Sequence, residues 1–224
     1  MKKYIVMLSF LISVLNYGQK ISKLKTDDEK ASYALGVKLA AEFIPKGLDK
    51  DINLNILIRA MRDKFNNKKL LFSEDSIQSF MANYLPEHLK KIGEINAENS
   101  KKFLELNKNR SGIYSTDSGL QYKILKEGTG PQPTEKDIVS VHYVLKTKEG
   151  IIIDNSKKSA SDKPVDYPFS QTILGWQEGI KLMNKGSKYI LYIPPELAYG
   201  ENGPLGPYQV LVFEVELVEI KSEI

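Results

Sequence analysis

The sequence predicts an α+β protein, in which an N-terminal helical domain precedes an antiparallel β-sheet wrapped around one short helix. Two observations support this prediction. Over residues 27–109, apolar residues recur every three or four positions, which is the period of an amphipathic helix. After Arg110, Ser111 and Gly112 the period falls to two, which is the alternation of a half-buried strand. We therefore expect a helical domain with a long linking helix over residues 19–112 and a sheet domain over residues 113–224.

The first part of the chain, residues 1–18, predicts a signal peptide. Lys2 and Lys3 precede an apolar run over residues 4–15, and Gly18 supplies a small residue at the expected cleavage point. The run is too short to span a bilayer; an uncleaved anchor or a buried helix is the alternative. Cysteine is absent, which excludes disulfides and a lipid-modified cysteine. We expect an exported protein, periplasmic or secreted, with no integral membrane span after signal cleavage.

The helical region predicts three helices. The first is stopped by Pro45 and Gly47, the second spans residues 54–65, and the third opens at Ser73. Pro86 should kink or interrupt the third helix, after which a sparse apolar stripe continues among polar residues to Leu106. Three such helices bury little alone, so we expect a homodimer through them; a self-contained helical cap folded onto the C-terminal domain is the alternative. Their apolar stripes contain Leu35, Leu39 and Phe43, then Leu54, Leu57, Ile58, Met61 and Phe65, then Ile77, Phe80, Met81, Tyr84 and Leu85.

The sheet region predicts short strands near residues 120–124, 138–145, 151–153, 165–169, 188–193 and 210–220. Glu149-Gly150 is a hairpin turn between two of them. Residues 175–184 predict the single short helix, with Trp176, Ile180 and Met183 facing inward. This arrangement is an antiparallel sheet with one helix.

Composition excludes several classes of function. The formal net charge is +4 without a concentrated basic face, so we expect no binding to nucleic acid. His88 and His142 lie in different segments and have no cysteine partner, and Gly128-Thr129-Gly130 lacks the further glycine of a phosphate loop. We therefore expect no cofactor and no metal site. An enzyme built from these residues would use little acid–base or metal chemistry.

A set of short motifs stands out against this background: Val141-His142-Tyr143, Asp154-Asn155-Ser156, Gly175-Trp176-Gln177-Glu178-Gly179, Ile193-Pro194-Pro195, Leu197-Ala198-Tyr199-Gly200 and Leu211-Val212-Phe213-Glu214-Val215-Glu216-Leu217. Their order and spacing over residues 120–220 resemble the FKBP family of peptidyl-prolyl cis/trans isomerases. The N-terminal Ser32-Tyr33-Ala34-Leu35-Gly36 resembles the two-domain, dimeric Mip-like and FkpA-like members.

The resemblance implies an isomerase that rotates X–Pro bonds in unfolded or partly folded, proline-containing polypeptides, and that binds macrolide inhibitors. It implies catalytic roles for Tyr143, Asp154, Trp176, Tyr199 and Phe213, with Trp176 as the floor of the proline pocket. It implies substrate binding by Ile153, Val165, Thr172, Ile173 and Leu205, the last from a flap over the pocket. The barrier to rotation, about 18–20 kcal/mol, comes from the loss of amide resonance. Because no bond breaks, the reaction needs no nucleophile.

Each assignment has a structural alternative. Trp176 could be a core tryptophan, Asp154 a turn acid and Tyr199-Gly200 a turn. Ile153 and Val165 stand where the family usually has phenylalanine, which predicts a looser pocket and weaker macrolide binding. The alternative function is a holdase chaperone that uses the isomerase domain to bind peptides; the polar helix over residues 87–109 motivates it.

Overall fold

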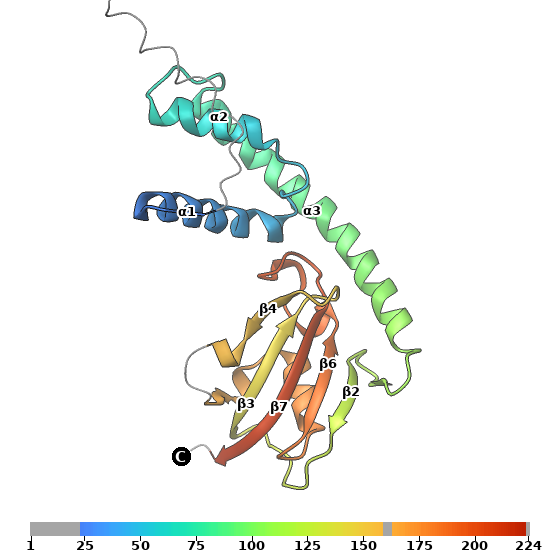
Figure 1. Cartoon of the computed structure of the whole chain (residues 1–224). Helices are drawn as coiled ribbons and strands as arrows, with labels where there is room; N and C mark the ends of the chain where they lie inside the picture. Colours follow the sequence, from blue (N-terminus) through green and yellow to red (C-terminus); the bar gives the residue numbers. More distant parts are fainter. Residues whose placement is uncertain (1–22, 159–162, 223–224) are drawn as a thin grey trace, which may run out of the picture. The chain divides into compact units, whose positions relative to one another are not determined.

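The computed structural model describes residues 23–158 and 163–222; the predicted signal peptide lies outside the described residues (Figure 1). The chain divides into two compact units, Met1–Ala41 and Glu42–Ile224. The second unit contains both the later helices and the entire sheet. The expected boundary between residues 112 and 113 therefore remains a prediction. In the described part of the chain, no helix is long and apolar enough to cross a membrane.

The helices occupy the predicted ranges. They are α1 (Asp27–Phe43), α2 (Leu54–Phe65) and α3 (Glu74–Asn107), with a short 3-10 turn at Ile44–Lys46 between the first two. Thr26 and Glu29 cap α1 reciprocally, because the Glu29 N–H donates to Thr26 Oγ1 and the Thr26 N–H donates to Glu29 Oε2. The Asn53 side chain caps α2 by accepting from two backbone amides.

The sequence predicted a kink or an interruption at Pro86, and the structure excludes the interruption: α3 runs for 34 residues with this proline inside it. A proline deprives the carbonyl four residues earlier of its donor, here Ala82, and both residues are exposed, so water can satisfy that carbonyl. Phe80, Tyr84 and His88 stack at ring-centroid distances of 5.2 and 5.5 Å, so side-chain contacts span the proline along the helix. The His88 ring also contacts the Lys46 carbonyl, with Nε2 at 3.0 Å from the oxygen.

The C-terminal part is an antiparallel sheet of seven strands (Figure 1). The strands are β1 (Tyr114–Ser115), β2 (Gln121–Lys126), β3 (Asp137–Lys146), β4 (Ile152–Asn155), β5 (Val165–Pro168), β6 (Lys188–Ile193) and β7 (Leu211–Ser222). Their order is β1-β2-β6-β7-β3-β4, and β5 pairs with the first half of β3 while β4 pairs with the second half. The long strands β3 and β7 form the centre of the sheet, and two strands in succession cover the outer edge of β3.

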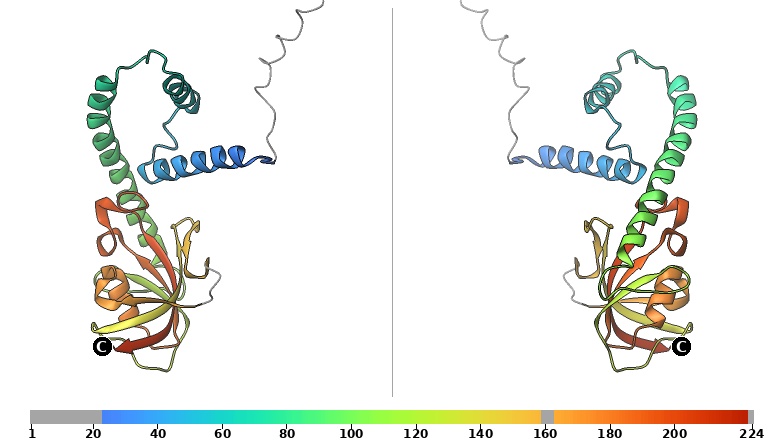
Figure 2. Two further views of the ribbon diagram at one scale, coloured as in Figure 1. Left: turned by 90° about the vertical axis from the view of Figure 1, so that its left-hand side faces the viewer. Right: turned by 90° about the vertical axis from the view of Figure 1, so that its right-hand side faces the viewer.

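Alternation along the central strands separates the two faces of the sheet. Val139 and Val141 of β3, Leu191 and Ile193 of β6, and Val215 and Leu217 of β7 are all buried. Residues at alternate positions of the same strands, among them His142, Lys188, Glu214 and Glu216, face the other side. Helix α4 (Leu174–Lys181) lies along the buried face, as both views in Figure 2 show.

Two glycines bring α4 into direct contact with β6. A Cβ on Gly175 would lie 2.2 Å from Cγ2 of Ile193, and one on Gly179 would lie 2.6 Å from Cδ1 of Leu191. These glycines are four residues apart and therefore share one face of the helix. The close approach holds the backbone of Trp176 at a fixed height above the sheet. The position of Trp176 thus depends on Gly175 and Gly179, which have no side chains.

Candidate active site

Trp176 forms the centre of an aromatic cluster on the buried face of the sheet. It is 5% exposed and is surrounded by the rings of Phe213, Tyr167 and Tyr143, at centroid distances of 5.1, 5.5 and 5.6 Å. All three contacts are edge-on, with interplanar angles of 75–86°. Such geometry is the favoured one for aromatic pairs. The cluster brings together residues from β3, β5, α4 and β7.

The indole Nε1 of Trp176 is buried and has no hydrogen-bond partner among the described residues. A buried N–H donor without an acceptor is destabilising, because water no longer solvates it. An apolar aromatic wall around an unsatisfied donor is an arrangement expected of a binding slot. It is less typical of a residue whose only role is to fill a core.

A polar pair accompanies the aromatic cluster. The Tyr143 hydroxyl donates to Asp154 Oδ2 at 2.6 Å, a length typical of a hydrogen bond to an ionised carboxylate. The other oxygen, Oδ1, accepts from the Asn155 backbone N–H at 2.8 Å. Burial raises the pKa of Tyr143 far above its ordinary value of 10.0, and the hydrogen bond to Asp154 raises it further. Tyr143 is therefore a neutral donor throughout the physiological range.

The backbone of Tyr143 is also fixed, because its N–H donates to Oγ of Ser156 at 2.9 Å. Ser156 directly follows β4 and is buried. The motif Asp154-Asn155-Ser156 therefore secures Tyr143 at two points, one on its side chain and one on its backbone. Its acid does more than complete a turn.

The other predicted site residues lie around this centre. Ile173 is the N-cap residue of α4, and Ile173 and Leu205 both pack on the core cluster that contains Trp176 and Phe213. Val165 lies in β5 two positions before Tyr167, and strand alternation places both on one face. Ile153 is half-buried in β4, beside the register shift at Leu145 and Lys146.

Two predicted site residues, Tyr199 and Thr172, are not part of the aromatic cluster around Trp176. Tyr199 is 48% exposed and borders a small void together with Leu205 and Gln209. The Thr172 hydroxyl donates to the Phe169 carbonyl at 2.8 Å, which uses its proton locally. The Thr172 carbonyl in turn accepts from the Gln177 side chain at 2.7 Å. Thr172 thus fixes the entry into α4, and any contact it makes with substrate remains a prediction.

Sequence reasoning missed Tyr167 as a site residue. Its alternation with Val165 and Phe169 predicted a strand correctly but did not indicate that this strand borders the slot. Its ring lies 5.5 Å from that of Trp176, and its hydroxyl lies 3.4 Å from the Tyr143 hydroxyl. An aromatic residue two positions after Val165 was the available signal.

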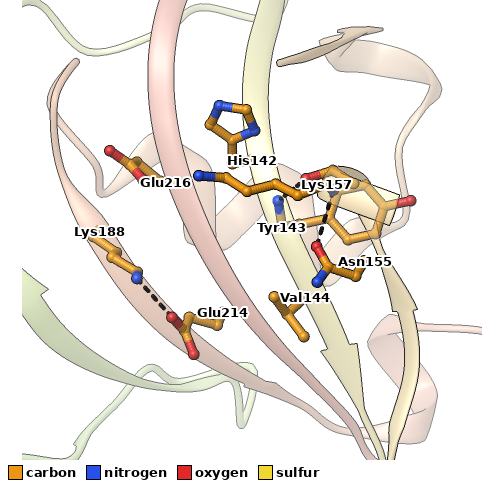
Figure 3. A pocket seen from close by; sticks show the side chains of 9 residues that line it. His142, Tyr143, Val144, Asn155, Lys157, Lys188, Glu214 and Glu216 are labelled. Atoms are coloured by element: carbon orange, nitrogen blue, oxygen red, sulfur yellow. Dashed lines mark hydrogen bonds and ion pairs between the residues drawn. The ribbon is translucent and has the colours of Figure 1, made fainter. Parts of the chain in front are cut away.

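A separate hollow of about 170 Å³ lies beside Tyr143, as Figure 3 shows. Its lining includes His142 and the charged residues Lys188, Glu214 and Glu216. Lys188 Nζ lies 2.6 Å from Glu214 Oε1, an ion pair between adjacent strands. Apart from Tyr143, none of the predicted site residues lines it. The hollow is therefore a different feature from the aromatic cluster around Trp176.

The fold and slot together define a class of protein. A sheet that packs its aromatic face against one short helix, with a neutral Tyr143 donor beside Asp154, can bind an apolar ring and a polar amide side by side. In the described residues, no group of three or more His, Cys, Asp or Glu side chains could hold a metal ion. The aromatic cluster and the Tyr143–Asp154 pair fit the class of peptide-binding isomerases, whose reaction is a bond rotation.

Family comparisons identify the chain. Residues 130–218 match the model of the FKBP-type peptidyl-prolyl cis-trans isomerase, and residues 28–124 match that of the domain amino-terminal to FKBP-type peptidyl-prolyl isomerase. The chain belongs to the FKBP family and is a peptidyl-prolyl cis-trans isomerase. The sequence prediction of family, fold class and enzyme activity is confirmed.

Its relatives match along most of their length. The probable FKBP-type peptidyl-prolyl cis-trans isomerase FkpA of Neisseria meningitidis is 38% identical over 86% of this chain and 74% of its own. The outer membrane protein MIP of Legionella longbeachae is 35% identical over 90% of this chain and 89% of its own. The crystal structure of FkpA from Escherichia coli superposes with a TM-score of 0.60 at 30% identity, over 89% of this chain and 99% of that one.

Proposed function

We propose that the slot around Trp176 is where this isomerase binds the proline of an unfolded or partly folded, exported polypeptide. One observation carries the proposal. Three aromatic rings surround the buried indole, and the Tyr143–Asp154 pair lies beside it. The proline ring would pack on Trp176, while the flanking amide would meet the polar groups.

The proposed mechanism follows from the electronic structure of the amide. Twisting the X–Pro bond removes resonance, so the carbonyl and nitrogen lose partial charge and the twisted form is less polar than the planar one. A slot with apolar walls disfavours the planar amide relative to the twisted amide, since less hydration is lost on reaching the transition state. Asp154 and Tyr143 would place fixed polar groups beside the carbonyl whose partial charge changes. No step transfers a proton.

Two further groups would anchor the substrate chain. Tyr199 is about half exposed and would offer its hydroxyl to a substrate carbonyl. Ile173 stands at the N-cap of α4, where helix geometry leaves the first backbone amides without intrahelical partners. An amide near Ile173 would bind a second carbonyl. These contacts would fix the substrate on both sides of its proline.

The variant Asp154→Asn tests the proposed site, because it keeps the shape of the side chain and removes its charge. It exchanges a charge-assisted hydrogen bond for a neutral one, so kcat/KM for an X–Pro peptide should fall about five- to tenfold. Asp137→Asn is the matched control. That carboxylate also accepts two hydrogen bonds, both from Thr134, but at the start of β3. Unchanged activity in Asp154→Asn, or an equal loss in both variants, would contradict the assignment.

The exposed apolar surface of the N-terminal helices supports a homodimer. No residue of α1 or α2 is buried, although both helices carry apolar stripes. Leu35, Leu54 and Phe65 are 68%, 66% and 77% exposed. Apolar surface of this extent on a folded protein usually marks an interface. We infer that a second copy of the chain covers it.

Sedimentation velocity tests the dimer directly. Leu54→Gln with Phe65→Gln should shift the protein to monomer while kcat/KM for a short peptide stays unchanged. The control Lys68→Gln with Lys69→Gln changes exposed residues just beyond α2 and should stay dimeric. A wild-type protein that sediments as a monomer at every concentration would refute the proposal.

We also propose that the protein is exported and works in the periplasm or outside the cell, which the predicted signal peptide supports. The names of the relatives support the catalytic function over the holdase alternative, because they are peptidyl-prolyl cis-trans isomerases. Suppression of aggregation by a variant without isomerase activity would support that alternative.

A further inference from the structure

The loop between the 3-10 turn after β6 and the start of β7 has a defined shape. This loop, residues 200–209, is called the flap below. The Tyr208 N–H donates to the Gly200 carbonyl at 2.7 Å, and the Gly206 N–H donates to the Gly203 carbonyl at 2.9 Å, so the flap closes on itself. Leu205 projects from it onto the core cluster that contains Trp176. One side of the flap therefore contacts the core cluster around Trp176, and its other side is free to contact a different element.

Helix α3 holds the other side of the flap through two hydrogen bonds. Asn96 Nδ2 donates to the Pro207 carbonyl at 2.9 Å, and Ser100 Oγ donates to the Tyr208 carbonyl at 2.7 Å. Ser100 is 1% exposed and Pro207 is buried, so water does not readily replace these donors. The two residues are four apart and face the flap from one side of the helix.

The packing around these hydrogen bonds is close. A Cβ on Gly93 would lie 3.3 Å from Cδ2 of Tyr208, so the helix backbone lies against that ring. On the other side, a Cβ on Gly206 would lie 2.3 Å from the Pro45 carbonyl oxygen. Gly206 also has a φ of +99°, which favours glycine independently. The flap is therefore seated between α3 and the turn at Ile44–Lys46.

The conformation of Tyr208 indicates that these contacts determine the flap. Its φ is +52°, in the left-handed region that a tyrosine seldom adopts. Such a conformation persists only where the surroundings over-determine it. Both backbone groups of Tyr208 are bonded, the N–H within the flap and the carbonyl to Ser100. Without α3, half of that support is lost.

We propose that Asn96 and Ser100 are positioning residues for the isomerase reaction, acting through the flap. They hold the flap so that Leu205 stays against the slot and Tyr199, directly before the flap, stays beside it. Substrate binding and selectivity thereby depend on a helix outside the sheet. The inference rests on the proposed site, because it gives the flap its role in covering the slot around Trp176.

The test is the full-length double variant Asn96→Ala with Ser100→Ala, assayed on X–Pro peptides that differ in the residue before proline. We expect kcat/KM to fall about three- to tenfold, mainly through a higher KM, since a mobile flap weakens binding and orientation. Hydrogen exchange at the amides of Gly206 and Tyr208 should accelerate. The matched control is Ser79→Ala with Asn83→Ala, the same residue types on an exposed part of α3, where Asn83 donates only to a backbone carbonyl of its own helix. It should leave both readouts unchanged.

Asn96→Asp is the second variant, because it keeps the shape of a half-exposed side chain and lacks the donor. It should raise KM without lowering the midpoint of thermal unfolding measurably, which a general loss of structure would do. Wild-type KM in both flap variants, or a fall confined to kcat, overturns the inference. An inactive wild-type protein would instead overturn the proposed site. The two failures are therefore distinguishable.

Discussion

The close packing of α4 on β6 predicts the effect of adding a methyl group at Gly175. In Gly175→Ala the new methyl group would lie 2.2 Å from Cγ2 of Ile193, whereas ordinary van der Waals contact begins at 3.4 Å. The helix must therefore move by about 1 Å or Ile193 must leave its position. Because Trp176 is the next residue, it moves with the helix. The variant thus displaces the floor of the slot without altering any residue that lines it.

The expected loss has two parts. Overpacking of a core costs about 1–3 kcal/mol of stability. A displacement of about 1 Å at a positioned group can lower a rate by about 100-fold, so kcat/KM for an X–Pro peptide should fall by about 10- to 100-fold. Trp176 is the only tryptophan in the chain, and its emission therefore reports on the slot alone. Its emission maximum should shift to longer wavelength as the indole becomes less enclosed.

A protease-coupled isomerisation assay, tryptophan emission and thermal unfolding would be measured together. Gly128→Ala is the control for overpacking, because its Cβ would lie 2.4 Å from the Lys185 carbonyl oxygen, outside the slot. It should lower stability and leave kcat/KM and emission unchanged. Gly36→Ala, with no atom within 4 Å of its Cβ, should lower neither stability nor kcat/KM. Wild-type activity and emission in Gly175→Ala would refute the argument that these glycines position Trp176.

Three further predictions concern the walls and charges of the domain. Ile153→Phe with Val165→Phe should restore aromatic surface and tighten macrolide binding about tenfold by calorimetry, since a buried ring adds apolar area; an unchanged Kd would show that neither side chain reaches the ligand. The pH profile of kcat/KM should show no loss from Tyr143 up to pH 10, because its raised pKa keeps the hydroxyl protonated; an inflection that disappears in Tyr143→Phe would contradict this. The hydrogen bond from Lys188 lowers the pKa of Glu214 below its ordinary value of 4.5, so the stability it confers is present above that value and declines as pH falls below it; thermal unfolding of Glu214→Gln should lack that part of the acid-induced decline.

Much of the fold could be predicted because each element reports its own burial. The alternation of Val139 and Val141 in β3 and of Val215 and Leu217 in β7 results from one buried face, and such a face imposes a period of two. The same reasoning located the single helix and its tryptophan. The family motifs then grouped Tyr143, Asp154, Trp176 and Phe213, and the structure brings these four residues into contact.

Tyr167 and the α3–flap contact could not be found in this way. The pattern of β5 shows that Tyr167 is half-buried, but its proximity to Trp176 depends on β5 pairing with the first half of β3, which no local period encodes. Pro86 predicted a kink or an interruption because local rules consider only the helix itself. The helix continues through it, and the proline is exposed with a stack of rings on either side of it.

The sequence by itself determined the order of elements and the family, and it predicted a set of candidate site residues, because these depend on local period and on ordered motifs. The tertiary structure alone decided how the slot is supported. Asn96 and Ser100 contact carbonyls more than 100 positions away in the chain. Polar side chains on a sparsely apolar helix carry no periodic signal of such contacts, since a hydrogen bond to a distant carbonyl requires only one well-placed donor. The flap's dependence on α3 is therefore visible only in the folded chain.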